Sequence, residues 1–223
     1  MKVYTFFTDS HRPLLDIFIK HFPFSIDHEL VVKWLPQDCP SACFGAHGWN
    51  ETMRRKVEFV QQSFSEVPEG AWFLHSDCDV VLFEGWDAIL QANNNAVNYD
   101  MLIQNDHMTG MCAGFFFCKN NERTRRLWRL VSDNLSDYAN DQVALNYFLN
   151  LEKDLKYLPL SCEYFTYGVL QAGYWKGQSF TIPQVDRLRM VHANYTVGID
   201  NKIELLRYVI NQRAVRLSTP ISS

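Results

Sequence analysis

The stretch FLHSDCDVVLF places two aspartates, Asp77 and Asp79, one residue apart between two apolar runs. Two like charges this close repel each other, and burying both beside a strand is costly unless a cation neutralises them. A divalent metal ion does so, and hard oxygen ligands favour Mg²⁺ or Mn²⁺, which often bind substrate phosphates as well. The pair therefore indicates a Mn²⁺ or Mg²⁺ site, with two solvated acids at the end of a strand as the alternative.

The first half of the chain alternates between strand-like and helix-like segments that would position this pair. The expected strands are 2–8, 28–35 and 71–77, and the expected helices are 12–22 and 48–64. This order predicts a doubly wound α/β sheet, mainly parallel and flanked by helices. Ligands of such sheets bind outside the carboxyl ends of the strands, and Asp77 lies at such an end.

The second half is less regular. The expected strands are 100–106 and 114–119, and the expected helices are 122–135, 141–152 and 199–213. The sequence contains no repeat or linker. We therefore expect a single domain over residues 1–223.

Composition excludes several classes of function. The 223 residues, 47% hydrophobic, suffice for one core, and 21 basic against 25 acidic residues leave no footprint for nucleic acid. Without a signal peptide or an apolar run of about 20 residues, we expect a soluble, cytoplasmic protein with no membrane segment. Most of the six cysteines lie in apolar runs. We expect structural thiols, because Cys39 and Cys43 lack a second Cys/His pair for zinc.

Four blocks then follow one another in the sequence. They are an apolar strand that ends in D-x-D (WFLHSDCDVVLF), a G-F-F strand (CAGFFFCKNNERTRRLW), a D-Q pair that opens a helix (NDQVALNYFL) and an H-x-N followed by glycine and lysine (MVHANYTVGIDNK). In content and order the blocks resemble the nucleotide-diphospho-sugar transferase family of the GT-A fold. The resemblance spans about residues 1–205. It implies a Rossmann-like GT-A domain with a nucleotide-binding half at about 1–105 and an acceptor-binding half at about 106–215.

The resemblance assigns the metal ligands. It implies that Asp79 coordinates the metal, that Asp77 contacts the ribose or the metal shell, and that His192 is the third protein ligand. One imidazole beside two carboxylates suits Mn²⁺. The alternative for His192 is a core or surface histidine without a ligand.

The D-Q pair, Asp141 and Gln142, lies at the donor sugar in the related enzymes. There the aspartate holds sugar hydroxyls and the glutamine lies near the anomeric carbon. The alternative is that Asp141 only caps its helix, with Val143, Tyr147 and Leu151 packing below.

The resemblance also implies the nucleotide contacts. Phe6, Thr8 and Asp9 lie at the end of the first strand, where the family forms its uridine pocket, although Phe6 could equally belong to the core. Lys56 stands where the family often carries a basic residue near the nucleotide, whereas its sequence context alone indicates an exposed helix charge. Cys78, between the two acids, is included among these contacts.

Gly198 and Lys202 complete the expected nucleotide site. The helix that begins here would direct free N–H groups and a positive dipole toward a diphosphate. Such positive groups stabilise the leaving nucleotide as the sugar bond breaks.

Aromatic residues between the D-Q and H-x-N blocks could form a platform for the acceptor sugar or pack in the core. They are Tyr164, Phe165, Tyr167, Tyr174 and Trp175. Where relatives often carry N-x-G, this chain has Cys112-Ala113-Gly114. The missing amide leaves the identity of the sugar open.

Together these features predict a metal-dependent glycosyltransferase that transfers a sugar from a nucleotide diphosphate, most simply a UDP-sugar, to a saccharide hydroxyl. Asp106 and Asp141 are the candidate bases, and the resemblance favours retention of the anomeric configuration. One alternative is a sugar nucleotidyltransferase, although TDSHRPLL lacks the expected glycine-rich loop. Another is an inactive carbohydrate-binding module, against which the D-x-D pair and His192 argue. The oligomeric state is not predicted.

Overall fold

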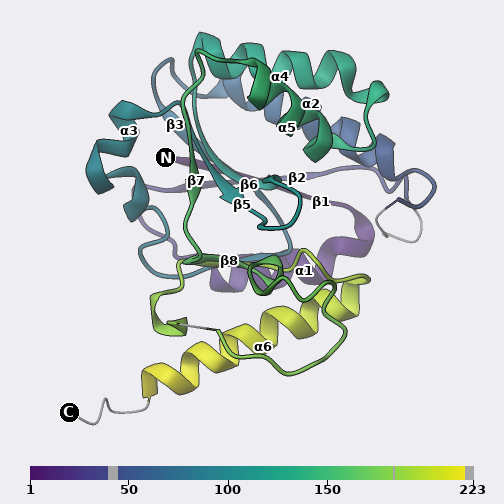
Figure 1. Ribbon diagram of the computed structural model, residues 1–223, viewed down its shortest axis with the longest axis vertical. Coiled ribbons are helices and arrows are strands. Elements are labelled where there is room, and N and C mark those ends of the chain that lie inside the picture. Colours follow the sequence, from purple (N-terminus) through teal and green to yellow (C-terminus); the bar gives the residue numbers. More distant parts are fainter. Residues whose placement is uncertain (40–44, 183, 219–223) are drawn as a thin grey trace.

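A six-stranded sheet forms the centre of the computed structural model, which describes residues 1–39, 45–182 and 184–218 and so leaves Cys43 outside (Figure 1). The strand order is β2-β1-β3-β6-β5-β7, and only β6 runs against the others. The strands are β1 (Lys2–Phe7), β2 (Glu29–Trp34), β3 (Trp72–Asp77), β5 (Met101–Asn105), β6 (Met111–Lys119) and β7 (Tyr157–Leu160). The predicted mixed, mainly parallel sheet is therefore confirmed.

A second, three-stranded sheet lies beside the first and has the order β4-β9-β8. Its strands are β4 (Val80–Leu82), β8 (Tyr164–Thr166) and β9 (Met190–His192). β4 follows the D-x-D pair directly and runs antiparallel to β9, so that Val80 lies opposite His192. This pairing brings two sequence blocks more than 100 residues apart to the same place.

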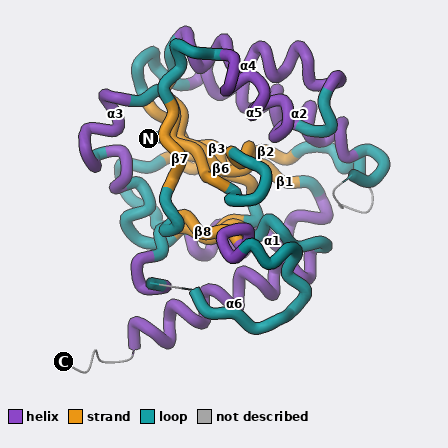
Figure 2. The backbone as a smooth tube through the Cα atoms, viewed as in Figure 1, coloured by secondary structure: helices purple, strands orange, loops and turns teal. Residues whose placement is uncertain are grey.

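Helices cover both faces of the central sheet (Figures 1 and 2). On one face lie α2 (Trp49–Glu66), α4 (Glu122–Asn134) and α5 (Asp141–Leu151). On the other lie α1 (Arg12–His21), the small sheet and α6 (Ile199–Ser218), with the short α3 (Asn95–Asn98) at the edge. The layers form the single α/β domain that the sequence predicts.

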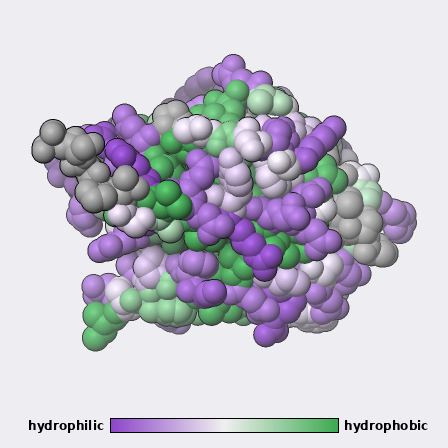
Figure 3. Space-filling view, turned by 90° about the horizontal axis from the view of Figure 1, so that it is seen from below, coloured by the Kyte–Doolittle hydropathy of each residue, from purple (hydrophilic) through white to green (hydrophobic). Residues whose placement is uncertain are grey.

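The core between the sheet and its helices is rich in aromatic rings. Val57 and Val60 of α2 pack against the sheet as their helical spacing predicts, and Phe116 of β6 stacks on Trp128 of α4 with ring centroids 4.8 Å apart. The face over α6 is mainly hydrophilic with small, separate apolar patches (Figure 3). Among the described residues, the helices are too short or too polar to cross a membrane.

One expectation for α5 is wrong. Val143, Tyr147 and Leu151 do not pack below the helix but are about half exposed. Leu145 and Phe148 pack in the core instead. The helix is apolar on more than one side, so spacing alone does not determine which stripe is buried.

Candidate metal and nucleotide site

The D-x-D pair lies at the carboxyl edge of the central sheet. Asp77 is the last residue of β3 and lies beside Phe6 near the end of β1, while Asp79 directly precedes β4. Because parallel strands end at the same edge, this is where an α/β sheet offers a binding site. The backbone C=O of Asp79 accepts a hydrogen bond from the N–H of Ala193, which continues the β4–β9 pairing.

Asp77, Asp79 and His192 form a compact set of ligand groups. One oxygen from each carboxylate and one nitrogen of the imidazole all lie within 4.8 Å of one another. His192 Nε2 lies 3.2 Å from Asp79 Oδ1, and both side chains are buried. Two hard oxygens and one imidazole nitrogen at this spacing fit a single Mn²⁺ or Mg²⁺ ion.

Gln104 determines which nitrogen of His192 faces the carboxylates. The Nε2 amide group of Gln104 donates to the backbone carbonyls of Tyr164 and Phe165 at 3.2 and 3.4 Å. Its Oε1 must therefore point the other way, where it accepts from Nδ1 of His192 at 2.8 Å. With Nδ1 carrying a proton, Nε2 is the nitrogen available to a metal.

Because Gly114 has no side chain, the side chains of Asp77 and His192 can pack against its backbone. A Cβ atom at this position would lie 2.6 Å from Asp77 Oδ2 and 2.6 Å from His192 Cε1. Both distances are far below van der Waals contact. The glycine of the G-F-F block is thus required by the two side chains beside it rather than by its backbone angles.

Lys56 is buried, so the interpretation as an exposed helix charge is wrong. Its ammonium group lies 3.1 Å from Asp77 Oδ1 and 3.0 Å from Asp141 Oδ2. Burial acts to lower the pKa of Lys56, but the carboxylates of Asp141 and Asp77 outweigh it and raise that pKa above its ordinary value. Lys56 therefore remains charged and connects the D-x-D strand to the start of α5.

Lys202 reaches the site from the first turn of α6 and forms an ion pair with Asp79 Oδ2. Gly198, with φ of +89°, directly precedes this helix. Burial acts to raise the pKa of Asp79, but Lys202 and His192 hold it well below its usual range. Burial likewise acts to lower the pKa of His192, yet Asp79 raises it to about 10. The charged groups of the site thus compensate one another.

Asp141 does not cap α5, so the cap alternative is wrong. The cap is Asn140, whose side chain accepts a hydrogen bond from the N–H of Val143 at 2.9 Å. Asp141 is the first residue of the helix and is buried against Lys56. Gln142 turns to the β5–β6 loop, where its amide contacts Asp106 and Thr109.

Phe6, near the end of β1, and the residues that follow β1 lie along the same edge of the sheet. Phe6 is largely buried, Thr8 Oγ1 lies 2.9 Å from His11 Nδ1, and Asp9 accepts a hydrogen bond from the indole of Trp34 at 2.8 Å. His11 is a site residue that the sequence analysis missed: burial and the neighbouring Lys202 lower its pKa. No spacing signal in the sequence identifies it.

Several other predicted contacts have side chains that pack in the core. The Cys78 thiol packs into the apolar cluster beside α1 and α6, where burial raises its pKa. Four of the five aromatic residues proposed as a platform are buried in the core, and only Tyr174 is half exposed. Core packing is therefore the correct interpretation for Tyr164, Phe165, Tyr167 and Trp175. Tyr195, which no sequence pattern singles out, contacts Thr109 through its hydroxyl at 3.3 Å.

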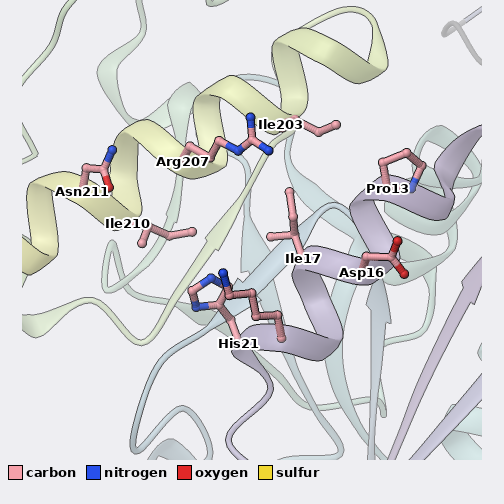
Figure 4. Close-up of a pocket in the computed structure, with 9 residues that line it drawn as sticks. Pro13, Asp16, Ile17, His21, Ile203, Arg207, Ile210 and Asn211 are labelled. Atoms are coloured by element: carbon pink, nitrogen blue, oxygen red, sulfur yellow. The ribbon is translucent and has the colours of Figure 1, made fainter.

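A groove of about 570 Å³ lies between α1 and α6, apart from these residues (Figure 4). Ile17 and His21 of α1 face Ile203, Arg207 and Ile210 of α6 across it. The predicted site residues do not line this groove. The candidate site is thus described by its charged side chains and not by this groove.

Solved structures of several glycosyltransferases share the fold. A glycosyltransferase involved in glycosylation of the major capsid of PBCV-1 aligns over 92% of this chain and 98% of its own, with a TM-score of 0.63 and 10% identity. Mouse xyloside xylosyltransferase 1 aligns over 87% and 98%, with a TM-score of 0.53 and 9% identity. The galactosyltransferase LgtC, solved with donor and acceptor sugar analogues, aligns over 86% of both chains, with a TM-score of 0.51 and 12% identity.

These identities establish the fold alone, and a search of curated protein sequences finds no match. The family comes from a profile for nucleotide-diphospho-sugar transferases, which matches residues 33–206. This range contains the D-x-D pair, the D-Q pair, His192 and Lys202. The chain therefore belongs to the nucleotide-diphospho-sugar transferase family, whose members are glycosyltransferases, and it has the GT-A fold.

Proposed function

We propose that this glycosyltransferase transfers a sugar from a UDP-sugar to a hydroxyl group of a saccharide and depends on Mn²⁺ or Mg²⁺. The observation that carries the proposal is the set of Asp77, Asp79 and His192 at the carboxyl edge of the sheet, with Lys202 beside it. Acids and a nearby cation at one site suit a metal-bound diphosphate. We further propose that residues 1–105 supply most contacts to the nucleotide and residues 106–215 those to the acceptor.

The donor set fits a divalent ion, which Asp77, Asp79 and His192 would hold. Such an ion acts as a Lewis acid on the departing diphosphate. Gln104 keeps Nε2 of His192 directed at the carboxylates, and Gly114 keeps the space clear. Lys202 and the N–H groups of the first turn of α6 would stabilise the negative charge of the leaving nucleotide.

At the β1 end, Phe6, Thr8 and Asp9 would contact the base and ribose, with His11 beside them. The hydroxyl of Thr8 and the carboxylate of Asp9 already hold defined hydrogen bonds, to His11 and Trp34. A nucleotide would meet oriented polar groups there, which lowers the entropy cost of binding.

At the other end of the site, Asp141 and Gln142 would meet the donor sugar. The salt bridge through Lys56 fixes the Asp141 carboxylate relative to the metal ligands. Asp141 would bind sugar hydroxyls, and Gln142 would lie near the anomeric carbon. We propose that the reaction retains the anomeric configuration.

The test begins with a screen of UDP-, GDP- and dTDP-sugars for release of free nucleotide in the presence of Mn²⁺. We expect UDP release from at least one UDP-sugar, abolished by EDTA and by Asp79→Ala. Asp133→Ala on the exposed side of α4 is a matched control that should retain the wild-type rate. Activity that survives excess EDTA would refute the metal role. Formation of UTP and sugar 1-phosphate from a UDP-sugar and added pyrophosphate, without release of UDP, would favour a nucleotidyltransferase.

A further inference from the structure

Asp106 closes a tight loop directly after β5. Its Oδ1 accepts hydrogen bonds from the backbone N–H groups of Met108, Thr109 and Gly110 at 2.9, 2.6 and 3.0 Å. The backbone N–H of Asp106 in turn donates to the carbonyl of Gly110 at 2.9 Å. One oxygen of this buried carboxylate is therefore fully engaged in holding the loop.

The other oxygen holds a side chain from a different element. Asp106 Oδ2 accepts from the hydroxyl of Thr109 and, at 2.5 Å, from Nε2 of Gln142 on α5. The same Nε2 also donates to Thr109 Oγ1 at 2.8 Å. Because an ionised carboxylate can only accept, the NH₂ end of the amide must face Asp106.

The orientation of Gln142 follows from these contacts. Both hydrogens on Nε2 are engaged, one by Asp106 and one by Thr109. The carbonyl oxygen of the amide, Oε1, points the opposite way, and within the described part of the chain no group donates a hydrogen bond to it. Asp106 and Thr109 thus leave the Oε1 atom of Gln142 as a defined acceptor that no described group occupies.

The loop is attached to α5 at a second point that does not involve Asp106. The Asn146 side chain accepts from the N–H of Met111 at 2.8 Å and donates to the carbonyl of Met111 at 2.7 Å. It also donates to the carbonyl of Gln142 at 2.8 Å. A change at Asp106 would therefore alter the direction of the Gln142 amide without detaching the loop from the helix.

We propose that Asp106 and Thr109 are positioning residues that turn the Gln142 carbonyl oxygen toward the donor sugar. The inference rests on the proposed function, which places Gln142 near the anomeric carbon. Positive charge develops at that carbon as the bond to the nucleotide breaks, and a fixed amide oxygen would stabilise it. With its lone pairs already occupied, Asp106 is better suited to this role than to accepting the proton of the acceptor hydroxyl.

Asp106→Asn tests the orientation directly. The backbone N–H groups keep an oxygen at the Oδ1 position, so the new NH₂ group takes the place of Oδ2. It can pair with Gln142 only if that amide turns over and presents its own NH₂ to the sugar. We expect kcat for UDP-sugar hydrolysis to fall about 100-fold or more, because the loss of one group that stabilises charge in the transition state costs about that much. KM for the donor should change little.

A double variant separates this role from simple damage. Gln142→Glu alone places two carboxylates against each other and should be as slow as Asp106→Asn. In Asp106→Asn with Gln142→Glu, the new carboxylate accepts from Asn and still presents an oxygen to the sugar. We expect this double variant to recover at least about tenfold over either single variant. Losses that instead multiply would overturn the inference, as would a wild-type kcat in Asp106→Asn.

Thr109 provides the measurement if Asp106→Asn does not fold. Thr109→Val removes the hydroxyl that accepts from Gln142, and Thr109→Ser restores it. We expect the valine variant to be at least about tenfold slower than the serine variant, and equal rates would overturn the inference. Asp133→Asn and Thr181→Val, at exposed positions, are the matched controls.

Failure of the proposed function and failure of the positioning role give different results. If the wild-type protein cleaves no nucleotide-sugar, the proposed function fails. If the wild-type protein is active, Asp79→Ala is inactive and Asp106→Asn keeps the wild-type rate, only the positioning role fails.

Discussion

Gly114→Ala should strongly weaken metal binding without unfolding the domain. The added Cβ would lie 2.6 Å from both Asp77 Oδ2 and His192 Cε1, whereas ordinary contact begins at 3.4 Å, so these groups must move by about 0.8 Å. Metal–ligand distances vary by only about 0.2 Å. At least one of the three ligands would therefore be lost. Since even a change behind the ligands costs about 10–100-fold in affinity, we expect Mn²⁺ to bind at least about 100-fold more weakly.

The assay is a Mn²⁺ titration followed by electron paramagnetic resonance, which detects the free ion, with urea unfolding in parallel. Overpacking should cost about 1–3 kcal/mol of unfolding free energy and leave the protein folded. Gly70→Ala is the matched control, because a Cβ atom at Gly70 meets nothing within 4 Å. Gly70 lies just before β3, at the end of the strand away from Asp77. Its φ of +81° predicts lost stability but unchanged metal affinity. Wild-type Mn²⁺ affinity in Gly114→Ala would refute the steric argument.

Two further predictions concern residues that support the site and the sheet. Gln104→Leu removes the acceptor for His192 Nδ1. We therefore expect Mn²⁺ affinity to fall about 10–100-fold in the same titration. Unchanged affinity would show that the tautomer of His192 does not depend on Gln104. Asp100→Asn weakens the bonds from Arg123, and we expect it to cost about 1.5–3 kcal/mol at pH 7 in urea unfolding. Burial acts to raise the pKa of Asp100, but Arg123 holds that pKa below its ordinary value of about 4. The stability contributed by the ionised Asp100 is therefore present above about pH 4 and is lost as the pH falls through the pKa of the native state. The difference between wild type and variant should therefore shrink from pH 7 to pH 3, and a constant difference would contradict the assignment.

The main strands and the position of the two acids at the edge of the sheet could be predicted because they depend on local patterns. An apolar strand that ends in D-x-D places both acids at a carboxyl edge whatever the partners of the strand are. The antiparallel direction of β6 and the short β4–β9–β8 sheet have no such local signature, because they depend on which strands pair. The order of the four blocks indicates that His192 belongs with the acids, whereas the residues around His192 in the sequence do not.

Residues whose role depends on a distant partner could not be predicted in the same way. Gln104 contacts His192 88 positions away, and nothing around it in the sequence distinguishes it from a polar residue in a strand. Lys56 lies on a helix with charged neighbours, and the tertiary packing of α2 buries it between Asp77 of β3 and Asp141 of α5. Periodicity predicts which elements form, whereas burial of a charge depends on the tertiary contacts.

The buried charges make the separate sequence blocks a single electrostatic unit. Asp77, Asp79 and Asp141 come from the D-x-D and D-Q blocks, and the buried Asp79 and Asp141 would destabilise the fold if they had no cationic partner. Lys56, from α2, is shared by the first and the third acid, and Lys202, from the last helix, binds the second. A chain that kept the acids but lost either lysine would leave a carboxylate with fewer cationic partners, so the lysines support the placement of the acids that would hold the metal.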